Sequence, residues 1–257
     1  MDAFSKGIER RLINEPWWKK WLLKIEQKRL VNYENLIFDY FDRHTIISEQ
    51  DRRFIYHAKR DCIHVIRNGV DATFFGVDRQ LENAITLLFT GNMSYPPNVD
   101  CAQYLVNEIM PLIWEKKPSV ELRLAGAKPH QKVLELASEK VIVTGWINDI
   151  REEYAKATVF VAPMRIGTGL QNKLLEAMSM ELPCVTSALA NNALQATPDK
   201  DILIGNDAQE VAATILTLIR DKERQDVIAK AGKIYVTKKF TWESTVDKLE
   251  KVFLGAS

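Results

Sequence analysis

The stretch VFVAPMRIGTGLQNKLLEAMSMELPCVTS, residues 159–187, decides the fold. The β-branched run VFVAP is followed by two glycines, Gly167 and Gly169, then by a helix-forming segment at 168–181 and a second β-branched run, PCVTS. An order of strand, loop, helix and strand is typical of parallel sheets with crossover helices. The stretch therefore predicts one βαβ unit of a larger α/β domain.

The loop and helix of this stretch carry groups suited to an anionic ligand. The free N–H groups and the dipole of a helix N-terminus favour an anion. Thr168 offers a hydroxyl, and Arg165 and Lys173 offer positive charge to phosphate oxygens. Glu176 shares a helix face with Asn172 and can accept hydrogen bonds from two adjacent hydroxyls, such as those of a ribose. From spacing alone, a mere surface ion pair between Lys173 and Glu176, worth less than ~1 kcal/mol, stays open.

The same alternation extends in both directions from this unit, starting at about residue 61. We expect strands at CIHVI, ITLLFTG, VELRLAG, VIVTGW, VFVAP, PCVTS and DILIG. We expect helices over 98–115, 129–138, 149–157, 168–181, 207–220 and 222–238. This pattern predicts a Rossmann-like parallel sheet with helices on both faces. Three strand ends carry glycine, at Gly91, Gly126 and Gly145, which predicts a ligand-binding edge there.

The first sixty residues read differently, as mainly helix. Pro16 is placed to begin a helix, and Ser48 with Asp51 is placed to cap another after a short strand, HTIIS. The tryptophans and lysines of PWWKKW, residues 16–21, allow two interpretations. The helix either lies on an anionic membrane or packs on another protein domain, and exposed apolar surface in the second case would favour self-association. A final helix in FTWESTVDKLEKVFLGAS carries an apolar stripe, and we expect it to pack on the N-terminal helices.

Composition narrows the function classes. A net charge of +1 at pH 7 argues against a protein dominated by nucleic-acid binding. The three cysteines, Cys62, Cys101 and Cys184, show neither a disulfide framework nor metal-ligand spacing, which predicts a reducing compartment. No run reaches the roughly 18 apolar residues of a membrane span, and the N-terminus lacks the apolar core of a signal peptide. We expect a cytoplasmic protein, or one on the inner face of the plasma membrane.

Six motifs follow one another along the chain: NGVD (68–71), FTGNMSYPPNVD (89–100), LRLAGAKP (122–129), VTGWINDI (143–150), the stretch at 159–187, and FTW (240–242). In this order they resemble retaining glycosyltransferases of family four, the glycosyl transferases group 1, which have the GT-B fold. The combination GxMxxxPN, NGVD and GxxxKxLEAM is similar to that of bacterial sugar transferases associated with exopolysaccharide systems. DAFSKGIERR and PWW also resemble the end of the first domain of those enzymes.

The resemblance implies three parts in an N-terminally truncated chain. Residues 1–60 resemble the mainly helical end of the N-terminal, acceptor-binding domain. Residues 61–238 resemble the complete donor-binding Rossmann-like domain, and residues 239–257 the C-terminal helix that crosses back to the first domain.

The resemblance also implies site residues. Glu176 matches the glutamate that holds the donor ribose, and Lys173 matches the lysine of the same helix in the subgroup. Three further segments match the family. The first glycine turn corresponds to Gly91, Asn92 and Met93, and the segment beside the base corresponds to Gly145, Trp146 and Ile147. The loop around the diphosphate and donor sugar corresponds to Gly167, Thr168, Gly169 and Leu170.

The sequence departs from the broad family pattern in three places. The family has a second glutamate with seven residues between the two, and here that position is Thr168. The first glycine turn, GNMSYPPN, lacks the arginine and lysine that bind the diphosphate, so Arg165 and Lys173 are candidate replacements. No catalytic residue is assigned, because the family's catalytic histidine belongs to the absent part. The histidines present do not match it: His44, His57, His64 and His130.

The implied activity is transfer of a sugar, with retention, from a nucleotide-diphosphate sugar of the UDP or GDP type to a hydroxyl acceptor. The acceptor would be a carbohydrate or a lipid-linked molecule in surface or exopolysaccharide synthesis, and neither a metal nor another cofactor is expected. Two alternatives stay open: a non-catalytic nucleotide-sugar-binding module, or one subunit of a two-chain glycosyltransferase whose other chain supplies the N-terminal half.

Overall fold

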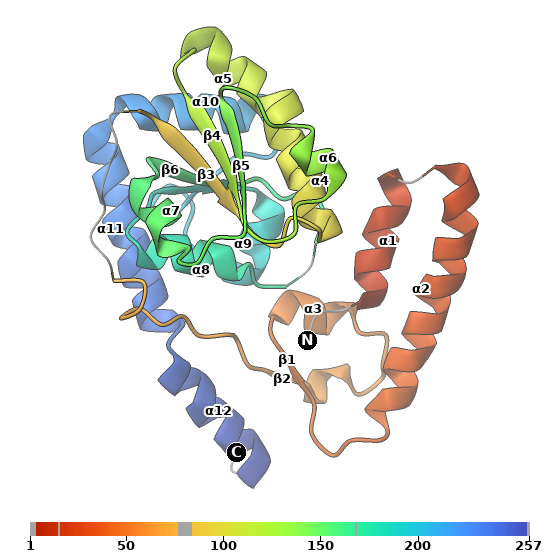
Figure 1. Cartoon of the computed structure of the whole chain (residues 1–257). Helices are drawn as coiled ribbons and strands as arrows, with labels where there is room; N and C mark the ends of the chain where they lie inside the picture. Colours follow the sequence, from red (N-terminus) through yellow and green to blue (C-terminus); the bar gives the residue numbers. More distant parts are fainter. Residues whose placement is uncertain (1–3, 15, 77–83, 168, 256–257) are drawn as a thin grey trace.

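The computed structural model describes residues 4–14, 16–76, 84–167 and 169–255. Its centre is a six-stranded, fully parallel sheet with the order β5-β4-β3-β6-β7-β8 (Figure 1). The strands are β3 (Thr86–Thr90), β4 (Glu121–Ala125), β5 (Val141–Gly145), β6 (Val159–Ala162), β7 (Cys184–Thr186) and β8 (Leu203–Ile204). The chain order reverses between β3 and β6, which places a topological switch point, the usual ligand-binding position of such sheets, at their carboxyl ends.

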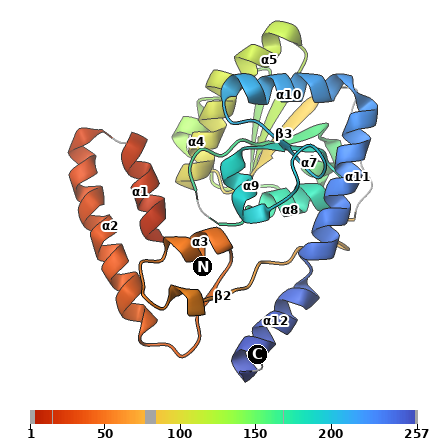
Figure 2. The same ribbon diagram turned by 180° about the vertical axis from the view of Figure 1, so that it is seen from behind.

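Helices cover both faces of the sheet, as the alternation predicted (Figures 1 and 2). The Rossmann-like domain contains α4 (Pro96–Tyr104), a π-helical turn (Leu105–Ile109), α5 (Met110–Lys116), α6 (Gln131–Leu134), α7 (Arg151–Lys156), α8 (Asn172–Ser179), α9 (Ala188–Leu194), α10 (Ala208–Arg220) and α11 (Lys222–Lys239). α5 packs against α10, and α8 packs against α11.

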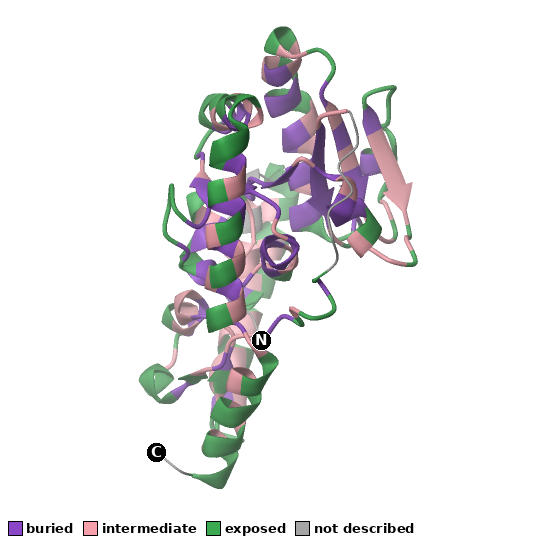
Figure 3. Ribbon diagram, turned by 90° about the vertical axis from the view of Figure 1, so that its left-hand side faces the viewer, coloured by how far each residue is buried: buried purple, intermediate pink, exposed green. Residues whose placement is uncertain are grey.

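The core of this domain lies between the sheet and its helices. Leu87, Leu88 and Phe89 of the central strand β3 are fully buried, because both faces of that strand are covered. Among the described residues, Tyr154 of α7 is the largest fully buried side chain, and its ring lies 5.7 Å from that of Phe160 of β6, tilted by 40°. Figure 3 shows the buried residues concentrated in the sheet and in the helix faces turned toward it.

The N-terminal segment forms a separate, smaller unit. Two helices, α1 (Phe4–Asn14) and α2 (Trp17–Phe38), pack side by side (Figure 1). A two-stranded parallel sheet follows, and its small core contains Phe38, Ile46, Ile55 and Ile63. The remaining elements are β1 (Thr45–Ile46), α3 (Glu49–Phe54), the 3₁₀ turn η1 (Arg60–Cys62), β2 (His64–Val65) and, at the other end of the chain, α12 (Trp242–Leu254).

Several local predictions are confirmed. Pro16 is the residue before α2, and Ser48 caps α3, where its hydroxyl accepts a hydrogen bond from the Asp51 backbone N–H at 3.0 Å. Thr241 caps α12 in the same way by accepting from the N–H of Ser244. These caps satisfy N–H groups that a helix start leaves without partners, which is why short polar residues predict helix starts so well.

Other predictions are wrong. The helix expected over 168–181 begins only at Asn172, because Gly167 and Gly169 have φ angles of 123° and 77°, outside the helical region. The helix expected over 129–138 shrinks to α6, and α9 was not predicted. The run CIHVI contributes only β2, which pairs with β1 and not with the main sheet.

The final helix also differs from expectation. α12 buries none of its residues, and its apolar side chains Trp242, Val246 and Phe253 are exposed. Its amphipathic pattern predicted the helix correctly but not a packing partner on the N-terminal helices. The reason is that periodicity reports which face is apolar and not what covers it.

Candidate functional site

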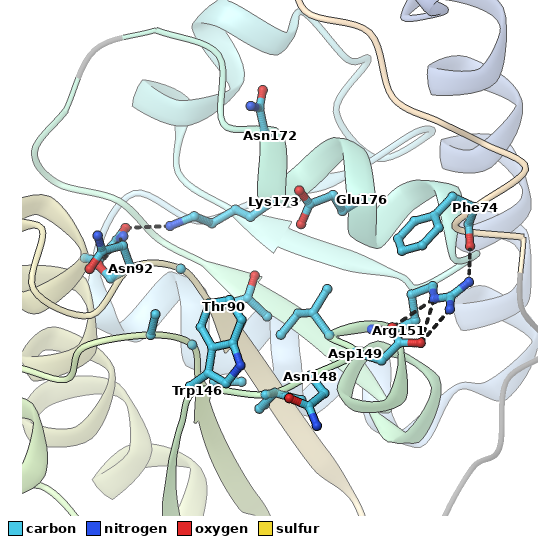
Figure 4. Close-up of a pocket in the computed structure, with 17 residues that line it drawn as sticks. Phe74, Thr90, Asn92, Trp146, Asn148, Asp149, Arg151, Asn172, Lys173 and Glu176 are labelled. Atoms are coloured by element: carbon cyan, nitrogen blue, oxygen red, sulfur yellow. Dashed lines mark hydrogen bonds and ion pairs between the residues drawn. The ribbon is translucent and has the colours of Figure 1, made fainter.

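A cleft of about 620 Å³ opens beyond the carboxyl ends of β3, β4 and β5, opposite the start of α8 (Figure 4). This volume lies within the range of small-molecule sites. Its lining residues come from the ends of β3 and β4, from four loops and from the helices α4, α7 and α8: Phe74, Thr90, Gly91, Asn92, Asn98, Ala125, Gly126, Ala127, Trp146, Ile147, Asn148, Asp149, Ile150, Arg151, Asn172, Lys173 and Glu176. The cleft therefore occupies the edge at which parallel α/β sheets bind ligands.

The floor of the cleft depends on two glycines that follow neighbouring strands. Gly91 and Gly126 have φ angles of 155° and 142°, and their backbones touch. A Cβ atom on Gly126 would lie 1.9 Å from the carbonyl oxygen of Gly91. A Cβ atom on Gly91 would lie 2.6 Å from the Asn98 amide nitrogen and 3.1 Å from the Lys173 ammonium. Glycine at these strand ends leaves the backbone open to a ligand and the lysine close beside it.

Lys173 supplies a positive charge to the cleft. Its ammonium donates a hydrogen bond of 2.5 Å to Oδ1 of Asn98 and lies 4.4 Å from the centre of the Phe89 ring. Burial lowers the pKa of Lys173 to about 8, while the nearby Cys101 and Glu176 act in the opposite direction. The ammonium is thus poorly hydrated and can bind an anion in the cleft.

Glu176 supplies a carboxylate to the same cleft. Its Oε2 accepts a hydrogen bond of 2.8 Å from the hydroxyl of Tyr154, which also lies 2.8 Å from the Thr90 hydroxyl. Burial raises the pKa of Glu176, and the Tyr154 hydrogen bond and Lys173 partly offset this rise. Since Oε1 has no hydrogen-bond partner within the described part of the chain, this carboxylate keeps acceptor capacity for ligand hydroxyls.

The outer rim of the cleft carries aromatic rings. The Trp146 side chain is 76% exposed, which leaves its ring face available for stacking. Across from it, the Arg151 guanidinium lies 4.0 Å from the centre of the Phe74 ring and donates to both carboxylate oxygens of Asp149 (Figure 4). This ion pair raises the pKa of Arg151 and lowers that of Asp149, so both groups are charged at neutral pH.

The structure brings half of the expected site residues into the cleft: Gly91, Asn92, Trp146, Ile147, Asn172, Lys173 and Glu176. The side chains of Met93 and Leu170 are buried in the hydrophobic core instead. Gly145 ends β5 with a φ angle of 71°, and Gly169 lies in the loop before α8, both outside the cleft lining. Thr168 falls outside the described residues.

Arg165 and Gly167 lie elsewhere. Arg165 donates to Asp100 and Glu108 at 2.9–3.2 Å and stacks on the Tyr104 ring, beside a different pocket. Its charge is therefore committed to α4 and the π-helical turn and is not available in the cleft. Gly167 lines a third, mainly apolar hollow between the α1–α2 pair and the start of α4.

Several cleft residues were missed from the sequence: Phe74, Thr90, Asn98, Asn148, Asp149 and Arg151 among those with side chains. Asn148 and Asp149 directly follow the expected Trp146 and Ile147, so extending that loop would have found them. Asn98 is the last residue of the motif GxMxxxPN, so the resemblance offered a signal for it. Phe74 offered no such signal, because it enters the cleft only through the packing of the loop before β3.

Two absences concern the residues that the structure describes. Within those ranges, no helix has the length and apolar character to cross a bilayer. In the same ranges, His, Cys, Asp and Glu side chains nowhere gather in groups of three that could hold a metal ion.

Comparison with known proteins assigns a family. The family model described as glycosyl transferases group 1 matches residues 84–221, more than half of the chain. The sulfoquinovosyl transferase SQD2 of Arabidopsis thaliana is 26% identical over 152 residues, 55% of this chain and 29% of that protein. An uncharacterized 44.6 kDa protein in the cps region of Klebsiella pneumoniae is 25% identical over 130 residues, 47% of this chain and 34% of its own length. The matches thus span about a third of these curated relatives.

Solved structures share the fold. Anabaena HepE in complex with UDP and glucose has a TM-score of 0.71 at 16% identity, covering 90% of this chain and 66% of that one. Sucrose-phosphate synthase from Thermosynechococcus elongatus has a TM-score of 0.71 at 20% identity, covering 90% and 63%. The C-terminal domain of LpcC from Francisella tularensis has a TM-score of 0.52 at 19% identity, covering 68% and 100%. The α/β architecture expected from the sequence is therefore confirmed, and it matches GT-B glycosyltransferases.

Proposed function

The chain belongs to the group 1 glycosyl transferases, and from this premise we propose that its cleft binds a nucleotide-diphosphate sugar of the UDP or GDP type. The sugar is then transferred, with retention, to a hydroxyl of a carbohydrate or lipid-linked acceptor. The observation that carries this proposal is that one cation and one carboxylate, Lys173 and Glu176, line the same cleft at the switch point of the sheet.

The two charged groups suit two different parts of such a ligand. The Glu176 carboxylate accepts hydrogen bonds and, at neutral pH, donates none, so it fits the paired hydroxyls of a ribose. The Lys173 ammonium, next to Gly91, fits the diphosphate, with the open N-terminus of α8 as a second source of positive potential. Trp146 at the rim offers a stacking surface for the base.

The same arrangement serves the reaction. As the bond between the sugar and the diphosphate breaks, negative charge accumulates on the departing phosphate oxygens. A cation fixed beside them before the reaction stabilises this charge without reorganising. Lys173 has this role in the proposal, and it acts only in its protonated form.

The parts of the chain follow the same proposal. In the proposal, residues 61–238 are the donor-binding domain, residues 1–60 are the mainly helical end of the N-terminal, acceptor-binding domain, and residues 239–257 are the C-terminal crossover helix. The proposed pathway is surface or exopolysaccharide synthesis, in the cytoplasm or at the inner face of the plasma membrane. Neither a metal nor another cofactor takes part. The alternatives are a nucleotide-sugar-binding module without activity and one subunit of a two-chain enzyme.

A binding and turnover assay separates these readings. The chain is titrated calorimetrically with UDP, GDP and their common sugars, and release of the nucleoside diphosphate is followed with glycan acceptors. Glu176→Ala is expected to weaken nucleotide binding by about 1.5–3 kcal/mol, the loss of one charged hydrogen-bonding group. Unchanged affinity in this variant contradicts the ribose assignment. Binding without release favours the module, and release only after addition of a separate N-terminal half favours the two-chain enzyme.

A further inference from the structure

Lys173 and Glu176 have opposite charges and stand three residues apart on α8, the spacing at which helix side chains usually pair. They nevertheless do not pair: within the described ranges, no ion pair of 4 Å or less joins them. Figure 4 shows the Lys173 side chain pointing away from Glu176. Because an isolated pair in a half-buried site attracts strongly, other residues must hold the two charges apart.

On the ammonium side, the holding residue is Asn98 of α4. Its Oδ1 accepts from Lys173, and its Nδ2 donates a 2.9 Å hydrogen bond to the backbone carbonyl of Asn92. Asn98 is itself only 5% exposed. One amide therefore ties the lysine to the glycine turn after β3, and it does so without adding a negative charge.

On the carboxylate side, the holding residue is Tyr154 of α7. An ionised carboxylate only accepts, so the Tyr154 hydroxyl donates to Glu176, and the Thr90 hydroxyl donates to Tyr154. Tyr154 is fully buried, and burial together with Glu176 raises its pKa well above the usual value. The tyrosine is therefore a neutral donor at neutral pH.

We propose that Asn98 and Tyr154 are positioning residues that keep Lys173 and Glu176 apart, each as a neutral partner of one charge. Both charges then stay open to a ligand that carries an anion at one end and hydroxyls at the other. A direct ion pair would neutralise both and would close this part of the cleft. The proposal rests on the proposed nucleotide-sugar site, but its structural half concerns the free protein alone.

The test measures Lys173 first without a ligand. The pKa of the ammonium is read by NMR in protein labelled at lysine Cε and Nζ, and the Lys173 signal is assigned with Lys173→Met. In the wild type the pKa is expected near 8. The charged and titratable groups around the ammonium are Cys101 from α4 and Glu176 from α8, and Phe89 of β3 adds its ring face. In Asn98→Leu and in Tyr154→Phe, release of either partner allows the ion pair to form, and the pKa of Lys173 is expected to rise.

A matched control separates positioning from general damage. Tyr235→Phe also removes a tyrosine hydroxyl, one that lies outside the cleft lining and contacts the backbone carbonyls of Leu194 and Gln195. It is expected to leave the Lys173 titration unchanged. If Asn98→Leu does not fold, Asn98→Asp takes its place, because aspartate keeps the shape of the side chain. This variant is expected to raise the Lys173 pKa by pairing with the lysine directly.

Binding completes the test. With UDP and with GDP as probes, Asn98→Leu and Tyr154→Phe are expected to lose roughly ten- to a hundredfold in affinity, as for one charged hydrogen bond. An unchanged Lys173 pKa in both variants overturns the positioning roles, whether or not nucleotides bind. A raised pKa with unchanged affinity overturns their link to the ligand. Absence of UDP and GDP binding in the wild type contradicts the proposed function, while the pKa result still decides whether the two charges are held apart.

Discussion

The backbone of Gly126 packs directly on the carbonyl oxygen of Gly91, at a distance that leaves no room for a side chain at position 126. This contact joins the ends of β3 and β4 and sets the floor of the cleft. It also explains why glycine is needed at the end of each strand: a ligand edge built from two touching turns has no space for Cβ atoms.

The first prediction compares two glycines. Gly126→Ala places its Cβ 1.9 Å from the Gly91 oxygen, so backbone strain and overpacking together are expected to lower the free energy of unfolding by about 2–4 kcal/mol. In Gly145→Ala the Cβ meets open space, and only the left-handed backbone costs about 1 kcal/mol. Urea unfolding of both variants measures the difference. Equal losses would show that the close contact does not exist in solution.

The second prediction decides between two cations. Lys173→Met is expected to lower affinity for UDP or GDP by roughly ten- to a hundredfold and to leave affinity for the nucleoside alone unchanged. Arg165→Met removes an equal charge that is already bound by Asp100 and Glu108, and nucleotide affinity is expected to stay as in the wild type. Calorimetry with nucleotide and nucleoside checks both variants. Loss of affinity in Arg165→Met and none in Lys173→Met would instead indicate that Arg165 binds the diphosphate.

The third prediction concerns pH. The pKa of Lys173 lies at about 8, below its usual value of 10.5, so the free chain loses this charge as the pH rises through 8. Affinity for a diphosphate is therefore expected to fall with rising pH above that point, approaching about tenfold per pH unit for one proton. Lys173→Arg keeps its charge in this range and is expected to show no such fall between pH 7 and 9. A wild-type profile that is flat there would mean that the protonated lysine is not needed.

The fourth prediction sets stability against binding. Burial raises the pKa of Glu176, so its ionised form destabilises the fold at neutral pH; this penalty is relieved as the pH falls through the raised pKa toward 4.5. Glu176→Gln removes the charge and still accepts from Tyr154. We expect a higher free energy of unfolding at pH 7 together with weaker nucleotide binding. A variant that is less stable and binds equally well would argue against a carboxylate kept for a ligand.

The sheet could be predicted from the sequence because each strand is a short, mostly apolar run and each crossover is local. The position of Glu176 and Lys173 at a sheet edge followed from the same local pattern. The partners of the two residues could not be predicted, since Asn98 and Tyr154 lie 75 and 22 residues away from them along the chain. Hydrophobic periodicity predicts local helices and strands, and it does not predict contacts between residues so far apart in the sequence.

Contacts with residues distant in the sequence also explain why the prediction for Arg165 is wrong. Its place after a strand suggested a phosphate contact, but Asp100 and Glu108, 65 and 57 residues away, bind it first. The start of α8 was misplaced for a local reason. Two glycines at positive φ delay the helix until Asn172, which brings Lys173 into its first turn, where its ammonium reaches the cleft.

The central claim is that the cleft binds a nucleotide-diphosphate sugar through Glu176 and Lys173. The most direct measurement is the melting temperature of the wild-type chain and of Glu176→Ala with UDP, GDP and their sugars. At a ligand concentration of about 100 Kd, binding adds about 2.7 kcal/mol to stability, a shift of several degrees. We predict such a shift for at least one nucleotide in the wild type and a much smaller one in the variant. No shift with any of them, or equal shifts in both proteins, would contradict the account.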